Sequence, residues 1–291
     1  MPGKLLEGKP IAEKLKAALA EEIKLRDREY KKVPKLVALQ MGENASSAVY
    51  VKNQKKAAES LGINYELKML DDDMSQEETE AAVADLNKDE SVTAMILQLP
   101  VPKQIDAKRL INAMDPSKDA EGMHPQNIGK ILLGGYRIGP CTAMAVMELL
   151  ESTGVDLYGK EAVVVGHSEI VGKPLALMLL NKFVTTTVCH IATGERGVLP
   201  EHVKRGEILV VAVGKAGLVK GDWVKEGAIV IDVGINRVGD KIVGDVEFET
   251  AAQRASYITP VPGGVGPLTT AILMRNVVEL FKAQNRWINV F

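Results

Sequence analysis

Residues 162–174, with the sequence AVVVGHSEIVGKP, constrain the fold more than any other part of the chain. The segment begins as a continuous apolar run, which is typical of a parallel strand buried on both faces. Gly166 then allows a sharp turn into a helix whose first N–H groups can bind a pyrophosphate. In the usual dinucleotide motif, G-x-G-x-x-G, the third glycine would fall one residue before Gly172. The segment predicts a nucleotide site, although such a turn also occurs as a simple tight connection.

Two later segments repeat the pattern of an apolar strand that ends in glycine. They are residues 208–214 (ILVVAVG) and residues 228–236 (AIVIDVGIN). Strands of this kind lie side by side in parallel sheets, where ligands bind beyond the carboxyl ends. We therefore expect a parallel sheet whose carboxyl edge holds a ligand.

The first half of the chain alternates helix and strand signals. We expect helices at 11–30 and 46–61, strands at 36–40, 65–70 and 94–99, and a capping box formed by Ser75 and Glu78. Residues 115–140, rich in Pro, Gly and Asn, indicate a boundary region that could also line a cleft. A last helix at 268–283 is expected to pack against the first half.

Composition is that of a soluble enzyme. The chain has 291 residues, enough for two domains, and a formal charge of -2, which gives no case for nucleic acid or an anionic membrane. The first residues lack a signal-peptide core and no apolar run could span a bilayer, so we expect a cytoplasmic protein. Cys141 and Cys189 are interpreted as structural thiols, and the four histidines lack ligand spacing, so no metal site is expected.

Seven segments, in this order along the chain, resemble the signature segments of a known enzyme family. They are residues 47–51 (SAVYV), 98–100 (QLP), 118–122 (KDAEG), 140–142 (PCT), 232–236 (DVGIN), 244–246 (GDV) and 260–267 (PVPGGVGP). The family is the bifunctional 5,10-methylenetetrahydrofolate dehydrogenase/5,10-methenyltetrahydrofolate cyclohydrolase. The resemblance covers nearly the whole chain, and so many ordered segments are highly specific.

The resemblance implies an α/β protein of two domains with a cleft between them, assembled as a homodimer that binds a folate substrate. A folate-binding catalytic domain would comprise residues 1–120 and 268–291, and a Rossmann-like cofactor domain with a parallel sheet residues 141–267. The catalytic positions are Tyr50, Gln54, Gln98 and Glu121. The substrate-binding positions are Tyr50, Gln98, Leu99, Pro100, Glu121, Pro262, Gly263 and Gly264. The cofactor-binding positions are Thr142, Gly166, His167, Ser168, Ile170, Val171, His190, Ile191, Gly214, Gly234 and Ile235.

Two departures from the family pattern fall among the catalytic positions. The family pairs its tyrosine with a lysine four residues later, on the same helix face, and here Tyr50 is followed by Gln54. In the family that lysine handles protons in the cyclohydrolase step and is held by the glutamine corresponding to Gln98. Lys52 and Lys55 lie off the ridge of Tyr50 and Gln54. Glu121 replaces a pterin-anchoring aspartate and lengthens its reach by one methylene.

The two reactions differ in what they require from the protein. Hydride transfer from the methylene bridge to a nicotinamide produces a cationic methenyl product and needs no obligatory acid or base, and a nearby ammonium would oppose that charge. Hydrolysis of the methenyl group requires proton movement, which an amine supports and an amide does not. We therefore expect dehydrogenase activity with weak or absent cyclohydrolase activity.

The residues around the glycine turn favour NAD, with NADP as the alternative. NADP-using members often have arginine after the turn glycine and a serine after the second strand; the corresponding residues here are His167 and Ile191. A largely neutral imidazole and an isoleucine are poor phosphate partners. No acidic residue closes the strand at His190 to hold the ribose hydroxyls, however, and Arg196 could still reach a phosphate.

Other interpretations of the same residues stay open. Gln54 could be a laboratory replacement or could be compensated by Lys55 or Lys56. The enzyme could be fully bifunctional through a rearranged proton relay. The chain could also be a non-catalytic dinucleotide-binding module that kept the fold.

Overall fold

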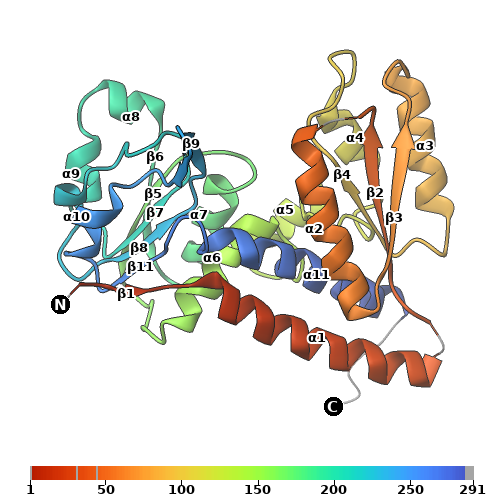
Figure 1. Ribbon diagram of the computed structural model, residues 1–291, viewed down its shortest axis with the longest axis horizontal. Coiled ribbons are helices and arrows are strands. Elements are labelled where there is room, and N and C mark those ends of the chain that lie inside the picture. Colours follow the sequence, from red (N-terminus) through yellow and green to blue (C-terminus); the bar gives the residue numbers. More distant parts are fainter. Residues whose placement is uncertain (1, 31, 44, 286–291) are drawn as a thin grey trace. The chain divides into compact units, whose positions relative to one another are not determined.

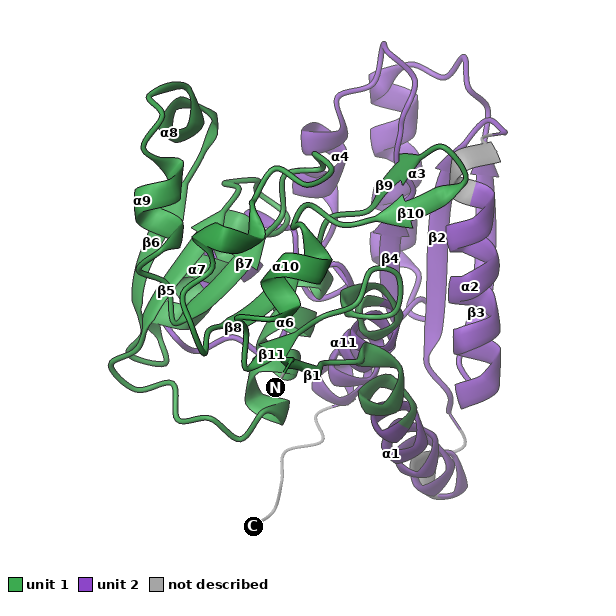
Figure 2. Ribbon diagram, turned by 60° about the vertical axis from the view of Figure 1, so that its left-hand side comes forward, with its two compact units in different colours: residues 1–13, 140–269 green, residues 14–139, 270–291 purple. Residues whose placement is uncertain are grey.

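The computed structural model describes residues 2–30, 32–43 and 45–285, which form two compact units (Figure 1, Figure 2). Unit 1 comprises Met1–Glu13 and Pro140–Thr269, and unit 2 comprises Lys14–Gly139 and Thr270–Phe291. The chain passes between the units three times: within helix α1 (Gly8–Tyr30), between Gly139 and Pro140, and within helix α11 (Val265–Gln284). Residue 1 and residues 286–291, at the outer ends of the expected folate domain, lie outside the described residues.

Unit 1 contains a six-stranded sheet in which all strands are parallel. Its order is β1-β11-β8-β7-β5-β6, with β1 Lys4–Leu5, β5 Glu161–Val165, β6 Thr185–Cys189, β7 Ile208–Val211, β8 Ile229–Asp232 and β11 Tyr257–Ile258. The three strands expected from the glycine-ended segments are β5, β7 and β8. Because β6 and β7 lie on opposite sides of β5, the chain changes direction across the sheet beside β5. Ligands bind at such a switch point in open α/β sheets.

Both faces of this sheet are covered, which explains the continuous apolar runs. Val163, Leu209 and Val230 belong to a core cluster with side chains from α9, η1 and α10. Val164 and Val210, which alternate with them along the strands, are also fully buried. The helices of unit 1 are α6 Cys141–Ser152, α7 Gly172–Leu180, α8 Ile191–Glu195, α9 Leu199–Val203, η1 Gly221–Trp223 and α10 Phe248–Ala252, and a hairpin joins β9 Asn236–Val238 to β10 Lys241–Val243.

Unit 2 is built on a three-stranded parallel sheet of order β3-β2-β4. The strands are β2 Lys35–Met41, β3 Asn64–Leu70 and β4 Ala94–Leu97. One face of β2 and β4 packs against apolar side chains of α3 and α4, such as Val83 and Leu110. The further helices are α2 Ala45–Leu61, α3 Gln76–Lys88, α4 Ala107–Ala113 and α5 Pro125–Leu132. The capping box of Ser75 and Glu78 at the start of α3 is confirmed.

Residues 115–140, expected to be a boundary region, belong to unit 2 up to Gly139 and end where unit 1 resumes at Pro140. This segment contains α5, and it is held by the buried carboxylate of Asp119, which accepts hydrogen bonds from the backbone N–H of Gly122 (2.9 Å) and His124 (2.8 Å) and from the Asn127 side chain (3.0 Å). The Pro, Gly and Asn residues therefore serve tight turns around a buried acceptor. Composition could not reveal that acceptor.

The last helix packs on unit 2 from Thr270 onward, as expected. The buried Asn276 side chain donates to the carbonyl groups of Ala120 (2.9 Å) and Gly139 (3.2 Å). Gln284 donates to the Thr93 carbonyl at 2.8 Å. Among the described residues, no helix is long and apolar enough to cross a membrane. The predicted α/β fold class with a parallel Rossmann-like sheet is confirmed.

Candidate functional site

The turn after β5 has a geometry that only glycine permits. Gly166 has a φ of +120°, and a Cβ at this position would collide with the carbonyl oxygen of Ala212. A Cβ on Gly172, the first residue of α7, would collide with the carbonyl oxygen of Gly166. Ser168 stabilises the same turn, because its hydroxyl accepts from the Val171 N–H at 3.2 Å. The predicted strand, turn and helix are thus tied together at the backbone level.

Two buried aspartates hold the loops that follow β7 and β8. The Asp245 carboxylate accepts from the backbone N–H of Val213 (2.7 Å), Gly214 (2.9 Å) and Lys215 (2.8 Å). The Asp232 carboxylate accepts from the N–H of Gly234, Asp245 and Val246 at 2.9, 3.0 and 2.8 Å. A Cβ on Gly234 would meet the Asp245 carboxylate. Gly214 and Gly234 therefore have structural roles in shaping this edge.

A pocket of about 720 Å³ lies at the carboxyl ends of β5, β6 and β7. It collects five of the predicted cofactor residues, which are Gly166, His167, Ser168, His190 and Ile191. The other predicted cofactor residues are outside its lining: Thr142, Ile170, Val171, Gly214, Gly234 and Ile235. Val171 is buried, whereas Ile170 and Ile235 are exposed. The pocket thus lies at the switch point of the sheet, beside β5.

Eight residues that line this pocket were not predicted from the sequence. They are Val165, Gly194, Glu195, Leu199, Ala212, Val213, Lys215 and Leu218. Val165, Ala212 and Val213 lie inside the strand-to-glycine segments that the sequence singled out, so that signal could have found them. The others reach the pocket through short helices and loops whose direction depends on the fold.

Two histidines stand together at the rim of the pocket. The ring centroids of His167 and His190 are 5.3 Å apart, and both residues are exposed. Ile191 beside them is 75% exposed. Among the described residues, no arginine lines the pocket; its charged side chains apart from the histidines are Glu195 and Lys215. An imidazole pair and an exposed isoleucine thus line the pocket at the predicted cofactor positions His167, His190 and Ile191.

In unit 2, the carboxyl end of β4 meets helix α2 through a pair of amides. The Gln98 Nε2 donates to the Gln54 Oε1 at 2.9 Å. The Tyr65 hydroxyl donates to the same oxygen at 3.2 Å, and burial raises the pKa of Tyr65 to about 12, so this hydroxyl stays protonated. Tyr50, one turn before Gln54 on α2, is 63% exposed. The structure therefore brings Gln54 and Gln98 together and adds Tyr65, which the sequence did not indicate.

The lysines near Gln54 are not the donors of its hydrogen bonds. Lys52, Lys55 and Lys56 are all exposed, and the Lys55 ammonium lies 3.9 Å from the Glu59 carboxylate on the same helix. The Gln54 oxygen instead accepts its hydrogen bonds from the neutral groups of Tyr65 and Gln98. An amide that accepts two neutral hydrogen bonds cannot take up a proton near neutral pH.

Glu121 follows the strand pair formed by β4 and its neighbouring segment. Met95 on β4 and Asp119 form a parallel bridge, which places Glu121 beside the end of the strand. Burial of its carboxyl group, with a contribution from Asp119, raises the pKa of Glu121 to about 7, although a hydrogen bond from the Leu97 backbone acts in the opposite direction. Glu121 is thus a group of unit 2 that changes charge near neutral pH.

The remaining substrate residues lie in turns. Leu99, 58% exposed, precedes Pro100 in a cis peptide bond, and a second cis bond joins Val261 to Pro262. Gly263 has a φ of +115°, and its carbonyl accepts from the Gly8 N–H at 3.0 Å. A Cβ on Gly264 would lie 2.7 Å from the Thr259 Cβ. Local packing in unit 1 accounts for these two glycines without a ligand.

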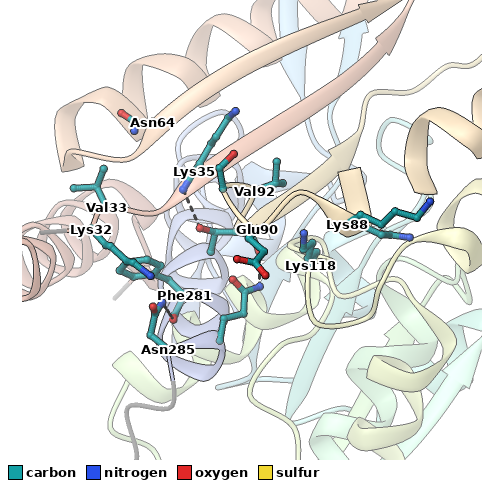
Figure 3. Close-up of a pocket in the computed structure, with 14 residues that line it drawn as sticks. Lys32, Val33, Lys35, Asn64, Lys88, Glu90, Val92, Lys118, Phe281 and Asn285 are labelled. Atoms are coloured by element: carbon teal, nitrogen blue, oxygen red, sulfur yellow. Dashed lines mark hydrogen bonds between the residues drawn. The ribbon is translucent and has the colours of Figure 1, made fainter. Parts of the chain in front are cut away.

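A second pocket, of about 680 Å³, lies at the amino end of the unit 2 sheet (Figure 3). Its lining includes Lys35, Asn64 and Thr93, which begin β2 and β3 and precede β4. Lys118, also in the lining, is buried and donates to the carbonyl groups of Leu86 (2.9 Å) and Asp89 (2.7 Å). Gln98 follows the opposite end of β4, so this pocket contains none of the predicted site residues.

Comparison with known proteins identifies the same family in the first and in the second part of the chain. The model described as tetrahydrofolate dehydrogenase/cyclohydrolase, catalytic domain, matches residues 6–121, and the corresponding NAD(P)-binding domain matches residues 140–285. The bifunctional protein FolD of Acetivibrio thermocellus is 47% identical over 98% of this chain and 99% of the relative. A similar solved structure is the Trypanosoma brucei dehydrogenase-cyclohydrolase complexed with NADP and inhibitor, with a TM-score of 0.93 and 39% identity over 98% and 99% of the two chains. The Campylobacter jejuni bifunctional enzyme FolD has a TM-score of 0.91 and 42% identity over 97% and 99%.

Proposed function

Because this chain belongs to the tetrahydrofolate dehydrogenase/cyclohydrolase family, we propose that it oxidises 5,10-methylenetetrahydrofolate to 5,10-methenyltetrahydrofolate with NAD. We propose further that its cyclohydrolase activity is weak. The homodimer that the resemblance implied and the cytoplasmic location expected from the sequence stay predictions.

The hydrogen bond between Gln54 and Gln98 carries this proposal. In the resembled family a lysine held by this glutamine moves protons during hydrolysis, and here an amide takes its place at 2.9 Å from Gln98. The Gln54–Gln98–Tyr65 group is neutral, so it opposes no positive charge that develops on the substrate during oxidation. It also offers no proton carrier for hydrolysis. The same contact therefore supports oxidation and disfavours the second reaction.

The pocket beside β5 suits a dinucleotide. The Gly166 turn has no room for a Cβ, and the pocket of about 720 Å³ opens at the switch point of the sheet. Gly166, His167, Ser168, His190 and Ile191 would hold the cofactor. The chemistry that a nicotinamide cofactor supplies when bound is acceptance of a hydride. The protein's contribution is to bind and orient, through backbone N–H groups at the start of α7.

The preference for NAD rests on what surrounds His167 and Ile191. Among the described residues, no arginine lines the pocket. The exposed side chain of Ile191 has no group that could donate a hydrogen bond to a 2′-phosphate. Arg196, the residue that could have reached a phosphate, directly follows α8 and is not part of the lining. The T. brucei relative is complexed with NADP, so a protein of this fold can bind the 2′-phosphate. We infer that the choice of cofactor in this chain depends on the side chains at His167 and Ile191.

Full bifunctionality is the second candidate, and one observation favours it. Glu121 has a pKa near 7, which suits a general acid or base at neutral pH. If Glu121 moved the protons, hydrolysis would persist without the family's lysine. Replacement Glu121→Gln would then abolish the hydrolysis shown by the wild-type protein.

An absorbance assay for methenyltetrahydrofolate tests the proposal. The purified protein is given 5,10-methylenetetrahydrofolate with NAD or with NADP, and the methenyl product is followed over time. Accumulation of the product, faster with NAD, is the expected result. A product that appears only transiently indicates a bifunctional enzyme, a faster reaction with NADP contradicts the cofactor preference, and no reaction with either cofactor favours a binding module.

A further inference from the structure

The end of the cofactor pocket that follows β6 carries a carboxylate. His190 directly follows β6, and α8 leads from there to Glu195, which is exposed and lines the pocket together with Gly166 and His167. The sequence shows no acidic residue at the strand end itself. Helix α8 is a short helix of little more than one turn. At its end Glu195, five residues after His190, brings a carboxylate to the pocket lining.

The order of the strands separates the two charged ends of this pocket. In the sheet, β5 lies between β7 and β6. Lys215 lies in the loop after β7, where its backbone N–H is bound by Asp245, and Glu195 lies in the segment after β6. Two strand spacings amount to roughly 10 Å. The lysine and the glutamate therefore belong to opposite sides of the Gly166 turn.

In a Rossmann-type site the pyrophosphate binds at the turn after the first strand, and the adenine-side ribose lies toward the end of the second strand. Here the first strand is β5 and the second is β6. The ribose hydroxyls would consequently lie on the side of His190, Ile191 and Glu195. A carboxylate in that place accepts hydrogen bonds from the 2′-hydroxyl and repels a 2′-phosphate.

We propose that Glu195 is the residue that selects NAD over NADP, by accepting a hydrogen bond from the 2′-hydroxyl of the adenine-side ribose and repelling a 2′-phosphate. This inference rests on the proposed function, because it takes the pocket beside β5 as the cofactor site. His167 and Ile191 provide no ligand for a 2′-phosphate. The carboxylate of Glu195 would in addition repel that phosphate, so the pocket would discriminate actively against NADP.

Direct binding measurements test this role without requiring the reaction. Calorimetry on the wild-type protein and on Glu195→Gln compares NAD+ with NADP+, and adenosine 5′-monophosphate with adenosine 2′,5′-bisphosphate. Glu195→Gln keeps the size of the side chain and removes its charge. Glu201→Gln is the matched control, since Glu201 is an exposed glutamate on α9 outside the pocket lining. Thermal unfolding verifies that each variant is folded.

The expected result is a change in selectivity confined to Glu195. The ratio of the NADP+ to the NAD+ dissociation constant should fall by roughly tenfold in Glu195→Gln, with the same direction for the two adenosine probes, and stay unchanged in Glu201→Gln. Glu195→Lys should lower the ratio further. The effect should shrink between low salt and about 0.5 M salt, because exposed charges are screened.

Two results would overturn the inference, and they have different meanings. Equal ratios in the wild-type protein and in both Glu195 variants show that this carboxylate does not select the cofactor, while the proposed dehydrogenase reaction is judged separately by the methenyl assay. If the wild-type protein binds none of the four probes, the pocket beside β5 is not a cofactor site, and both the inference and the proposed function are wrong.

Discussion

The two candidate sites differ in what holds them in shape. At the carboxyl edge of the unit 1 sheet, backbone groups define the turn at Gly166, and the buried carboxylates of Asp232 and Asp245 bind the N–H groups of the neighbouring loops. In unit 2, side chains alone connect Gln54, Gln98 and Tyr65. A site built from backbone groups is disrupted when a larger side chain collides with them or when a carboxylate that accepts their hydrogen bonds is removed. A side-chain-built site is sensitive to charge and can change its chemistry by one substitution.

The largest expected effect is a gain of hydrolysis in Gln54→Lys. An ammonium at this position can donate to Gln98 and move protons, so decay of methenyltetrahydrofolate should accelerate by about 100- to 10,000-fold over the wild-type protein. Absorbance decay measures the rate. The control is Lys55→Gln, which removes an exposed lysine paired with Glu59 and should change nothing. Rapid hydrolysis by the wild-type protein, far above the buffer rate, would contradict the proposed role of Gln54.

A second replacement supplies the phosphate ligands that the unit 1 pocket lacks. The double variant His167→Arg with Ile191→Ser should shift selectivity toward NADP by roughly 1.5–3 kcal/mol for each new charge-assisted hydrogen bond to the 2′-phosphate. Dissociation constants for NAD+ and NADP+ measure the shift. A wild-type protein that already prefers NADP would refute the underlying comparison with the family.

The third prediction concerns the buried acceptor of unit 1. Asp245→Asn leaves some of the N–H groups of Val213, Gly214 and Lys215 facing an amide donor, so the free energy of unfolding should fall by about 1.5–3 kcal/mol. Urea unfolding measures this loss. Asp240→Asn, in the exposed turn between β9 and β10, is the control and should have little effect. Equal stabilities of the two variants would show that Asp245 does not hold the loop.

Added volume at the start of α7 should weaken cofactor binding. A valine at Gly172 collides with the carbonyl oxygen of Gly166, and overpacking of this kind typically costs about 1–3 kcal/mol. The dissociation constant of NAD+ should rise accordingly in Gly172→Val. Gly266→Ala is the control, because a Cβ there meets nothing within 4 Å. Unchanged NAD+ affinity in Gly172→Val would place the cofactor elsewhere.

The smallest effect is a pH dependence of folate binding through Glu121. Its carboxyl group has a pKa of about 7, so the ionised form, which accepts hydrogen bonds from a pterin, falls from about nine tenths at pH 8 to one tenth at pH 6. The KM for 5,10-methylenetetrahydrofolate should therefore rise roughly tenfold as the pH is lowered over this range. Glu121→Gln should have a flat profile. A wild-type KM that is constant from pH 6 to pH 8 would exclude Glu121 as the anchor.

Strands β5, β7 and β8 and the glycine turn of unit 1 could be predicted because their causes are local. A strand buried on both faces must be apolar throughout, and the collision of a Cβ at Gly166 or Gly172 demands glycine. Helix α5 was not predicted, although Pro125 stands at its start and its apolar residues are spaced as on one helix face; the carboxylate of Asp119 holds its first turn through the N–H of His124 and the side chain of Asn127. The folate and cofactor assignments from the resemblance stay predictions, with geometry now attached to Gln54, Gln98 and the Gly166 pocket.

The sequence by itself determined the family, the α/β fold class and the absence of a lysine at position 54, because each is a property of residue types in order. Only the tertiary structure decided that Tyr65 donates to Gln54 and that Glu195 lines the pocket beside β5. It also decided which acids are buried deeply enough to change their pKa, as Glu121 is. These contacts join residues from different elements, and their distances depend on how sheets and helices pack, which no local pattern in the chain encodes.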